Sequence, residues 1–156
     1  MIYYIDTSFL LSILFNETTK ANSIGIWKKA PIRMSSVLLK AESLISLRRL
    51  NSHLNLKQNW LQIKQTELDE ILNEVTMRNV DEKILEVIKL NNKLADCRTL
   101  DAVHLVTAVE IRDNTLEEKI VICTYDKKMS ELARKMRFQV IPNTNITKKT
   151  EKFPSL

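Results

Sequence analysis

Glycine is almost absent from this sequence. Gly25 is the one glycine among 156 residues. A dinucleotide-binding fingerprint and a glycine-rich phosphate-binding loop both need several glycines, because a side chain would keep the backbone away from the phosphate. The sequence therefore excludes two large classes of nucleotide-binding site.

Cysteine and long apolar runs are scarce as well. Cys97 and Cys123 form neither a Cys-x-x-Cys pair nor a metal-ligand spacing, so we expect two free thiols. No run approaches the roughly 18 apolar residues that a membrane-spanning helix needs. Residues 1–6 reach the carboxylate of Asp6 without the basic lead of a signal peptide. We therefore expect a cytoplasmic protein with no membrane contact.

The overall composition is that of an ordinary globular domain, with 44% hydrophobic and 28% charged residues. A chain of this length buries about two-thirds of its unfolded surface, so one core is expected. The net charge of +5 and the pI near 9.2 permit binding to nucleic acid or another acidic partner, but many basic proteins bind neither. Charge alone does not identify a function.

Short apolar runs alternate with helical patterns along the chain. The runs typical of strands are residues 2–5, 32–34, 75–77, 120–123 and 138–141. Helical periodicity covers residues 9–15, 19–29, 37 to beyond 47, 56–72, 81–94, 98–111 and 127–136. This alternation predicts an α/β fold with a parallel sheet covered on both faces. We expect one domain over residues 1–142 and a polar tail over residues 143–156.

The expected helices differ in how they are capped and buried. Thr7 or Ser8 is expected to cap the first helix, and Ser35 or Ser36 the third, because a hydroxyl accepts from a free backbone N–H there. The 98–111 helix is apolar nearly all round and should lie in the middle of the fold.

The helix expected over residues 56–72 carries Trp60, Leu61 and Ile63 on its apolar side. The helix expected over residues 81–94 begins at Asp81.

Two aspartates follow expected strands directly. In open parallel sheets the functional crevice lies at the carboxyl ends of the strands, where Asp6 and Asp126 would stand. Each also precedes a helix, so each can be a helix cap instead. Either interpretation fits one aspartate taken alone.

Two further acids lie on expected helices. An ionised Asp101 on an apolar helix is costly unless it is paired or binds a cation. Arg98, one turn away, could supply the pairing. Glu42 alone would be expected to point to solvent. Only convergence of these acids with the two aspartates above would make them one site.

Four segments of the chain resemble the motifs of the PIN-domain ribonucleases, and most closely those of VapC-type toxins from bacterial toxin–antitoxin pairs. They are residues 4–11 (Tyr-Ile-Asp-Thr-Ser-Phe-Leu-Leu), 36–42 (Ser-Val-Leu-Leu-Lys-Ala-Glu), 98–105 (Arg-Thr-Leu-Asp-Ala-Val-His-Leu) and 124–129 (Thr-Tyr-Asp-Lys-Lys-Met). The third segment is the most specific. The resemblance extends from residue 2 to about residue 141.

The resemblance implies a three-layer α/β/α fold with a central parallel sheet. It implies that four acids come together as catalytic residues and as ligands of one or two Mg²⁺ or Mn²⁺ ions: Asp6, Glu42, Asp101 and Asp126. Hard divalent cations prefer carboxylate oxygen, and clustered carboxylates need a counterion. The metal would activate a water for attack on a phosphodiester bond.

Several neighbouring residues are expected to assist this site or to have ordinary structural roles. Hydroxyls of Thr7, Ser8 and Thr124 can orient the carboxylates or cap helices. Arg98 can contact a substrate phosphate, an acid or a partner. His104 is expected to be buried and hydrogen-bonded rather than a general base.

The chain departs from the family pattern in two places. The connection over residues 110–119 is longer and more charged than expected, and Arg137-Phe138 replaces a glycine turn before the last strand. A basic surface that steers RNA, or simply solvated side chains, could be formed by Arg48, Arg49, Lys127, Lys128, Lys148 and Lys149.

The leading hypothesis is a Mg²⁺-dependent endoribonuclease, the toxin of a toxin–antitoxin pair, with an RNA substrate, a cognate antitoxin and a homodimeric assembly implied by the resemblance. One alternative is a PIN-type nuclease that processes RNA or cleaves single-stranded DNA. Another is an inactive PIN-fold module that binds RNA or protein, although four retained acids argue against it. A haloacid dehalogenase phosphatase would need a second aspartate where Ser8 stands.

Overall fold

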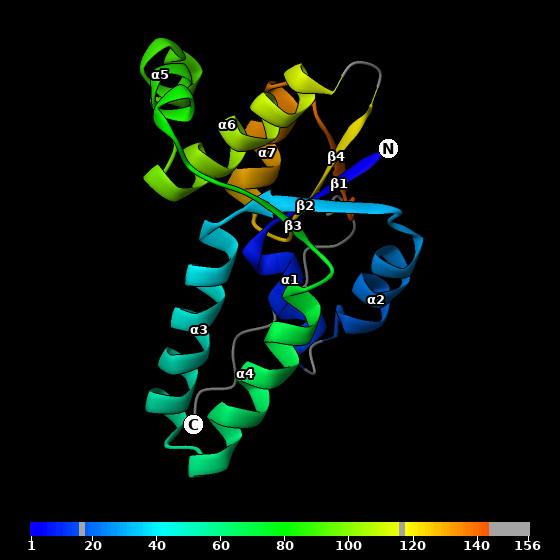
Figure 1. Ribbon diagram of the computed structural model, residues 1–156, viewed down its shortest axis with the longest axis vertical. Coiled ribbons are helices and arrows are strands. Elements are labelled where there is room, and N and C mark those ends of the chain that lie inside the picture. Colours follow the sequence, from blue (N-terminus) through cyan, green and yellow to red (C-terminus); the bar gives the residue numbers. More distant parts are fainter. Residues whose placement is uncertain (16–17, 116–117, 144–156) are drawn as a thin grey trace.

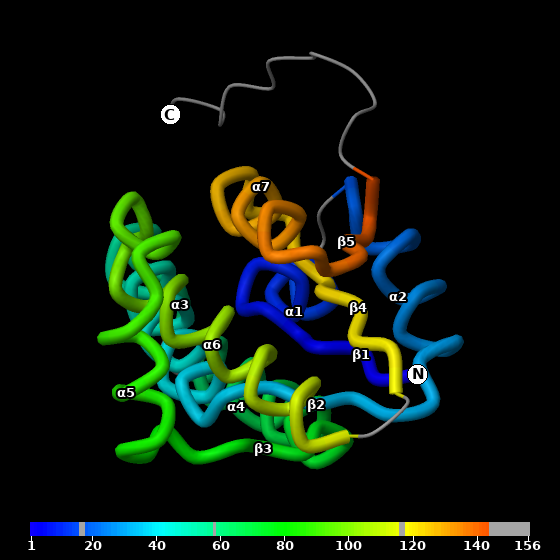
Figure 2. Tube along the Cα trace, turned by 90° about the horizontal axis from the view of Figure 1, so that it is seen from above, coloured from blue at the N-terminus to red at the C-terminus, as the bar shows by residue number. Residues whose placement is uncertain are grey.

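A single parallel sheet forms the centre of the molecule. The computed structural model describes residues 1–15, 18–115 and 118–143. The strands are β1 (Ile2–Ile5), β2 (Ile32–Ser36), β3 (Thr76–Arg78), β4 (Ile120–Cys123) and β5 (Gln139–Ile141). They pair in parallel in the order β3-β2-β1-β4-β5, which can be followed from bottom to top in Figure 2. The five expected strands are confirmed.

Helices cover both faces of the sheet. They are α1 (Thr7–Leu14), α2 (Lys20–Lys29), α3 (Leu38–Leu54), α4 (Gln58–Leu72), α5 (Glu82–Leu90), α6 (Thr99–Asn114) and α7 (Lys127–Lys135). In Figure 1, α1 to α4 lie below the sheet and α5 to α7 above it. This confirms the expected three-layer α/β/α fold. Of the polar tail expected over residues 143–156, residues 144–156 lie outside the described part of the chain.

Strand β1 separates two hydrophobic cores, because successive side chains of a strand point to opposite faces. Ile2 and Tyr4 pack with α6 and α7 in one core. Ile5 packs with α1, α3 and α4 in the other. Each fully buried large apolar side chain contributes about 1.5–3 kcal/mol to stability. Packing on both faces therefore fixes the position of β1, and with it the position of Asp6, the next residue.

Helix α6 is the buried helix that its sequence predicts. Its buried side chains come from almost every position in its middle: Ala102, Val103, His104, Leu105, Val106, Thr107, Ala108, Glu110 and Ile111. Glu110 can be buried because the Arg78 guanidinium bonds its carboxylate at 2.9 Å and 3.2 Å. That ion pair joins β3 to α6.

Four local expectations were wrong. Asp6, not Thr7 or Ser8, caps α1, because the helix begins directly after β1 and the Asp6 carboxylate accepts from the Ser8 N–H. The helix opened by Asp81 ends at Leu90, and Leu94 belongs to a separate short 3-10 helix, Asn92–Leu94.

Ile63, expected on the apolar side of α4, is 52% exposed. Contrary to expectation, neither Ser35 nor Ser36 is the N-cap of α3, which is Val37. The Ser36 hydroxyl accepts from the Leu38 N–H at 3.2 Å from one residue further back.

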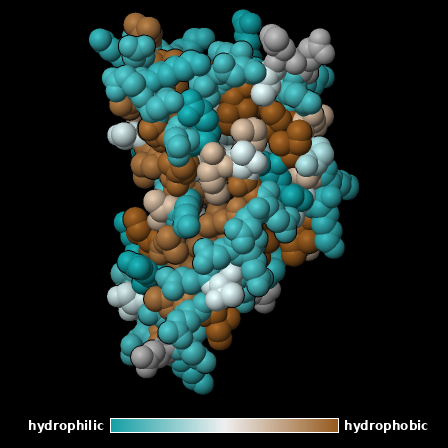
Figure 3. Space-filling view, in the orientation of Figure 1, coloured by the Kyte–Doolittle hydropathy of each residue, from teal (hydrophilic) through white to brown (hydrophobic). Residues whose placement is uncertain are grey.

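The surface view agrees with this layering. Apolar residues gather across the middle of the face shown in Figure 3, and hydrophilic residues cover most of its two ends. No helix among the described residues is both long and apolar enough to cross a membrane. Cys97 and Cys123 are free, as expected.

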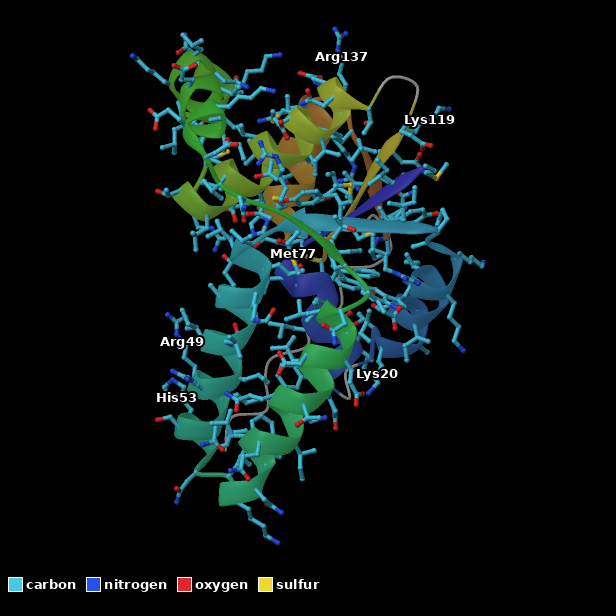
Figure 4. The ribbon with its side chains drawn as sticks, viewed as in Figure 1. Lys20, Arg49, His53, Met77, Lys119 and Arg137 are labelled. Atoms are coloured by element: carbon cyan, nitrogen blue, oxygen red, sulfur yellow. The ribbon has the colours of Figure 1, made fainter. Side chains whose placement is uncertain are left out.

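Arg137 stands where a glycine was expected, and its backbone is left-handed, with φ of 68°. Its side chain points into solvent at the top of Figure 4. A residue with a Cβ pays about 1–2 kcal/mol in this conformation.

We predict that Arg137→Gly raises the free energy of unfolding by up to about 1 kcal/mol, because the relief of strain exceeds the roughly 0.4–1 kcal/mol of added chain entropy in the unfolded state. Arg137→Ala is the control, since it removes the same side chain and keeps the Cβ. Urea unfolding of both variants would measure the difference, and equal midpoints would contradict the prediction.

Candidate active site

A pocket of about 230 Å³ opens at the carboxyl edge of the sheet. All four predicted acids line it, and the full set of lining residues is Asp6, Thr7, Ser8, Glu42, Ile45, Ser46, Arg49, Arg98, Leu100, Asp101 and Asp126. The topology explains this convergence. The carboxyl ends of the central parallel strands lie at this edge, and the pocket is lined from α1, α3 and α6 together with the residues just before α1, α6 and α7.

Asp6 is the most firmly held of the acids. It is 7% exposed. Its Oδ2 accepts hydrogen bonds from the Ser8 hydroxyl at 2.6 Å, the Thr124 hydroxyl at 2.8 Å and the Ser8 amide at 3.2 Å. Hydrogen bonds from Ser8 and Thr124 therefore hold the Asp6 carboxylate in one orientation.

Asp126 both caps a helix and lines the pocket, the two roles that the sequence left open for it. Its Oδ1 caps α7 by accepting from the Met129 amide at 2.9 Å. Its Oδ2 faces the pocket and accepts from Arg98 at 2.8 Å. Ser8 and Thr124 oxygens accept from the Asp126 amide at 3.2 Å and 3.0 Å. The two hydroxyls thus connect Asp6 with Asp126.

Arg98 bridges two of the acids. Its Nε and one terminal nitrogen bond the two oxygens of Asp101 at 2.7 Å and 3.1 Å, and that terminal nitrogen also reaches Asp126. The hydrogen bond to Asp101, reinforced by the charges of Asp101 and Asp126, raises the pKa of Arg98 above its usual range. The side chain is nevertheless 61% exposed. The sequence allowed an Arg98–Asp101 ion pair as the reason why an acid is tolerated on this apolar helix. That ion pair is present, and it lies inside the pocket.

Glu42 faces the pocket instead of solvent. Its Oε2 accepts from the Thr7 hydroxyl and contacts His104 Nε2 at 3.0 Å. Burial favours the protonated form and raises the pKa of Glu42, but the hydrogen bonds from His104 and Thr7 outweigh burial and leave that pKa below its usual value. Glu42 is therefore a carboxylate at neutral pH.

His104 is buried and hydrogen-bonded, as expected. Its side chain is 2% exposed, with Nδ1 2.9 Å from the Tyr4 hydroxyl and Nε2 against Glu42. The role of Tyr4 was missed, because a tyrosine in a short apolar strand gives no sign of a partner 100 positions away.

Arg49, one of the basic residues considered for an RNA-steering surface, lines the pocket. Arg49 and His53 extend from α3 on the side away from α4 (Figure 4). Lys127 approaches Glu131 at 4.0 Å, and Lys128 lines a separate depression on α7. Lys148 and Lys149 lie outside the described residues.

The donor set suits a hard divalent cation, since the pocket offers carboxylate and hydroxyl oxygens. Across residues 1–15, 18–115 and 118–143, however, no three acidic, histidine or cysteine side chains lie close enough together to hold one ion. Asp101 and Asp126 are turned toward Arg98. A metal ligated by these acids would require Arg98 to move.

The fold and the pocket define an α/β/α domain with an acidic site at the carboxyl edge of its sheet. The family model of the PIN domain matches residues 3–135, and the chain belongs to that family. No curated protein matches the sequence.

Two solved structures have the same fold. A chain of VapBC2 from Rickettsia felis, in a complex bound to a DNA fragment from their promoter, has a TM-score of 0.63 at 14% identity, over 90% of this chain and 97% of that one. A chain of VapBC-1 from nontypeable Haemophilus influenzae has a TM-score of 0.59 at 15% identity, over 90% and 96%. The resemblance found in the sequence is thereby confirmed at the level of family and fold.

We predict that Arg98→Gln lowers the free energy of unfolding by about 0.5–1 kcal/mol at low ionic strength, because Asp101 and Asp126 lose their shared cation. For a domain of this size, the thermal midpoint falls by about 1–4 °C. Lys127→Gln removes the same charge from a side chain that is 88% exposed, and it serves as the control.

Calorimetry at low and high NaCl would measure both variants. The difference should shrink with added salt, which screens exposed charges. Equal midpoints for the two variants at low salt would show that Arg98 does not stabilise the acidic pair.

Proposed function

We propose that this protein is a metal-dependent endoribonuclease, the toxin of a toxin–antitoxin pair. The observation that carries the proposal is the convergence of Asp6, Glu42, Asp101 and Asp126 on one pocket. Four acids in one place are costly in a domain that does not use them, because like charges raise one another's pKa and destabilise the fold.

The four carboxylates would hold one or two Mg²⁺ or Mn²⁺ ions. Such an ion, when bound, supplies an activated water and offsets charge on the scissile phosphate. The chain's own residues prepare the site. Ser8 and Thr124 hold Asp6 in one orientation, while Arg98 and Arg49 place positive charge beside the acids, where a phosphodiester would bind.

The partner of the proposed toxin would be a cognate antitoxin. This part of the proposal is supported by the two structural relatives, which are both VapBC complexes. The pocket has an apolar wall of Ile45 and Leu100, 48% and 47% exposed, next to its charged floor. A protein chain could cover that wall and exclude RNA. Assembly into a homodimer remains a prediction.

Two other functions use the same fold. A nuclease of RNA maturation, or one that cleaves single-stranded DNA, would have the same acids and a different physiological role. An inactive binding module would not need the Asp6 carboxylate to be held by three donors.

We predict that Asp6→Asn and Asp101→Asn each reduce RNA cleavage by at least about 100-fold, because each removes a ligand charge and preserves volume. Asp113→Asn is the control, since Asp113 lies on α6, 60% exposed, and pairs with Arg112. Cleavage would be followed on single-stranded RNA with Mg²⁺ or Mn²⁺ and with a chelator, and circular dichroism would verify folding. Near-wild-type cleavage by a folded Asp6 or Asp101 variant would remove that residue from the site.

We also predict that expression of the wild-type chain alone arrests bacterial growth, whereas Asp101→Asn at the same protein level does not. Colony counts after induction would measure the effect. Growth unimpaired by wild-type protein that cleaves RNA in vitro would favour the RNA-maturation alternative over the toxin.

A further inference from the structure

We propose that Tyr4 and His104 are positioning residues that orient Glu42 through a continuous chain of hydrogen bonds from the centre of the sheet to the pocket. The proposal rests on the proposed function, because it assigns Glu42 a ligand in that pocket. It concerns residues that do not line the pocket themselves.

The chain of contacts connects four elements. The Ser36 amide at the end of β2 donates to the Tyr4 hydroxyl of β1 at 3.2 Å. The same hydroxyl lies 2.9 Å from His104 Nδ1 on α6. His104 Nε2 lies 3.0 Å from Glu42 Oε2 on α3. The two rings meet edge to face, with an interplanar angle of 82°.

The direction of these bonds is fixed at the two ends of the chain. A backbone N–H can only donate, so the Tyr4 oxygen accepts from Ser36. The Glu42 carboxylate can only accept, so His104 Nε2 carries the proton that is donated to it. A lone pair on Nε2 would face the carboxylate and leave this bond unmade. The Tyr4 hydroxyl proton can be donated to His104 Nδ1 or to the neighbouring hydroxyls of Ser35 and Thr107.

Burial makes this arrangement rigid. Tyr4 and His104 are both buried, so water does not replace a lost partner. Desolvation also raises the pKa of Tyr4 well above its usual value, which keeps its hydroxyl proton available for donation. The rings are packed between β1 and α6, and neither can turn without breaking a buried hydrogen bond.

The hydrogen bonds to Glu42 distinguish its two carboxylate oxygens. His104 and Thr7 both bond Oε2, and in the described part of the chain no donor bonds Oε1. One oxygen is therefore fixed by the protein while the other is left for a ligand in the pocket. Residues that hold a metal ligand in this way change metal affinity by about 10–100-fold when they are removed.

The proton positions can be measured directly. The chain has two histidines, and exposed His53 provides an internal reference. Long-range ¹H–¹⁵N correlation spectra of the full chain should show His104 with a protonated Nε2. An unprotonated Nε2 would overturn the proposal, whatever the protein binds.

The positioning role is tested by titrating Mn²⁺ alone into four variants and the wild type. His104→Leu removes the donor and should weaken binding by about 10–100-fold, and Tyr4→Phe should weaken it by about tenfold. His104→Gln keeps an N–H near the Nε2 position and should stay within about threefold of the wild type. Tyr3→Phe, on the neighbouring residue that packs on the opposite face, should change nothing.

A double-mutant cycle separates positioning from general damage to the fold. In a Glu42→Gln background, His104→Leu should cost no further Mn²⁺ affinity, because its effect passes through the Glu42 carboxylate. A full additional loss there would overturn the proposal, and so would wild-type affinity in His104→Leu. Failure of the wild type to bind Mn²⁺ would overturn the metal site, and with it both this inference and the proposed function. Wild-type binding without an effect of His104→Leu would overturn this inference alone.

Discussion

The structure depends on the way four carboxylates are kept together at one edge of a parallel sheet. Carboxylates that share a small pocket repel one another, so each needs donors or a cation. Hydrogen bonds hold two of them: hydroxyls and an amide bond Asp6, and a hydroxyl and a histidine ring bond Glu42. The other two share the Arg98 guanidinium. Two of the carboxylates are thus stabilised by hydrogen bonds, and the other two are paired with one exposed cation.

The sheet makes this arrangement possible because β1 lies at its centre. Its side chains alternate between two cores, so the strand is fixed on both faces and Asp6 begins at a defined point. Tyr4, two residues earlier, points toward α6 and reaches His104. One short strand therefore positions an acid of the pocket directly and a second acid, Glu42, through a side chain on another element.

Sequence patterns predicted what local periodicity determines. The strand ending at Asp6, the apolar helix around Asp101 and the parallel α/β architecture all follow from the spacing of apolar residues. Contacts between side chains that lie far apart in the sequence do not follow from this spacing. The bridge from Arg98 to Asp126 spans 28 positions, and the contact of His104 with Glu42 spans 62. The interpretation of Asp6 and Asp126 as either caps or site residues was too narrow, because one carboxylate has two oxygens and can do both.

The two halves of the pocket differ in how easily they can change. The bonds of Asp6 are buried, so replacing them would expose or strand polar groups inside the protein. Arg98 is 61% exposed, and water can solvate its guanidinium as it leaves the acids. A divalent cation or a partner's charged side chain would therefore displace Arg98 first and leave the bonds of Asp6 and Glu42 in place. Under the proposed function, the fixed acids would define where a ligand binds, and Arg98 would keep the other two acids neutralised until it arrives.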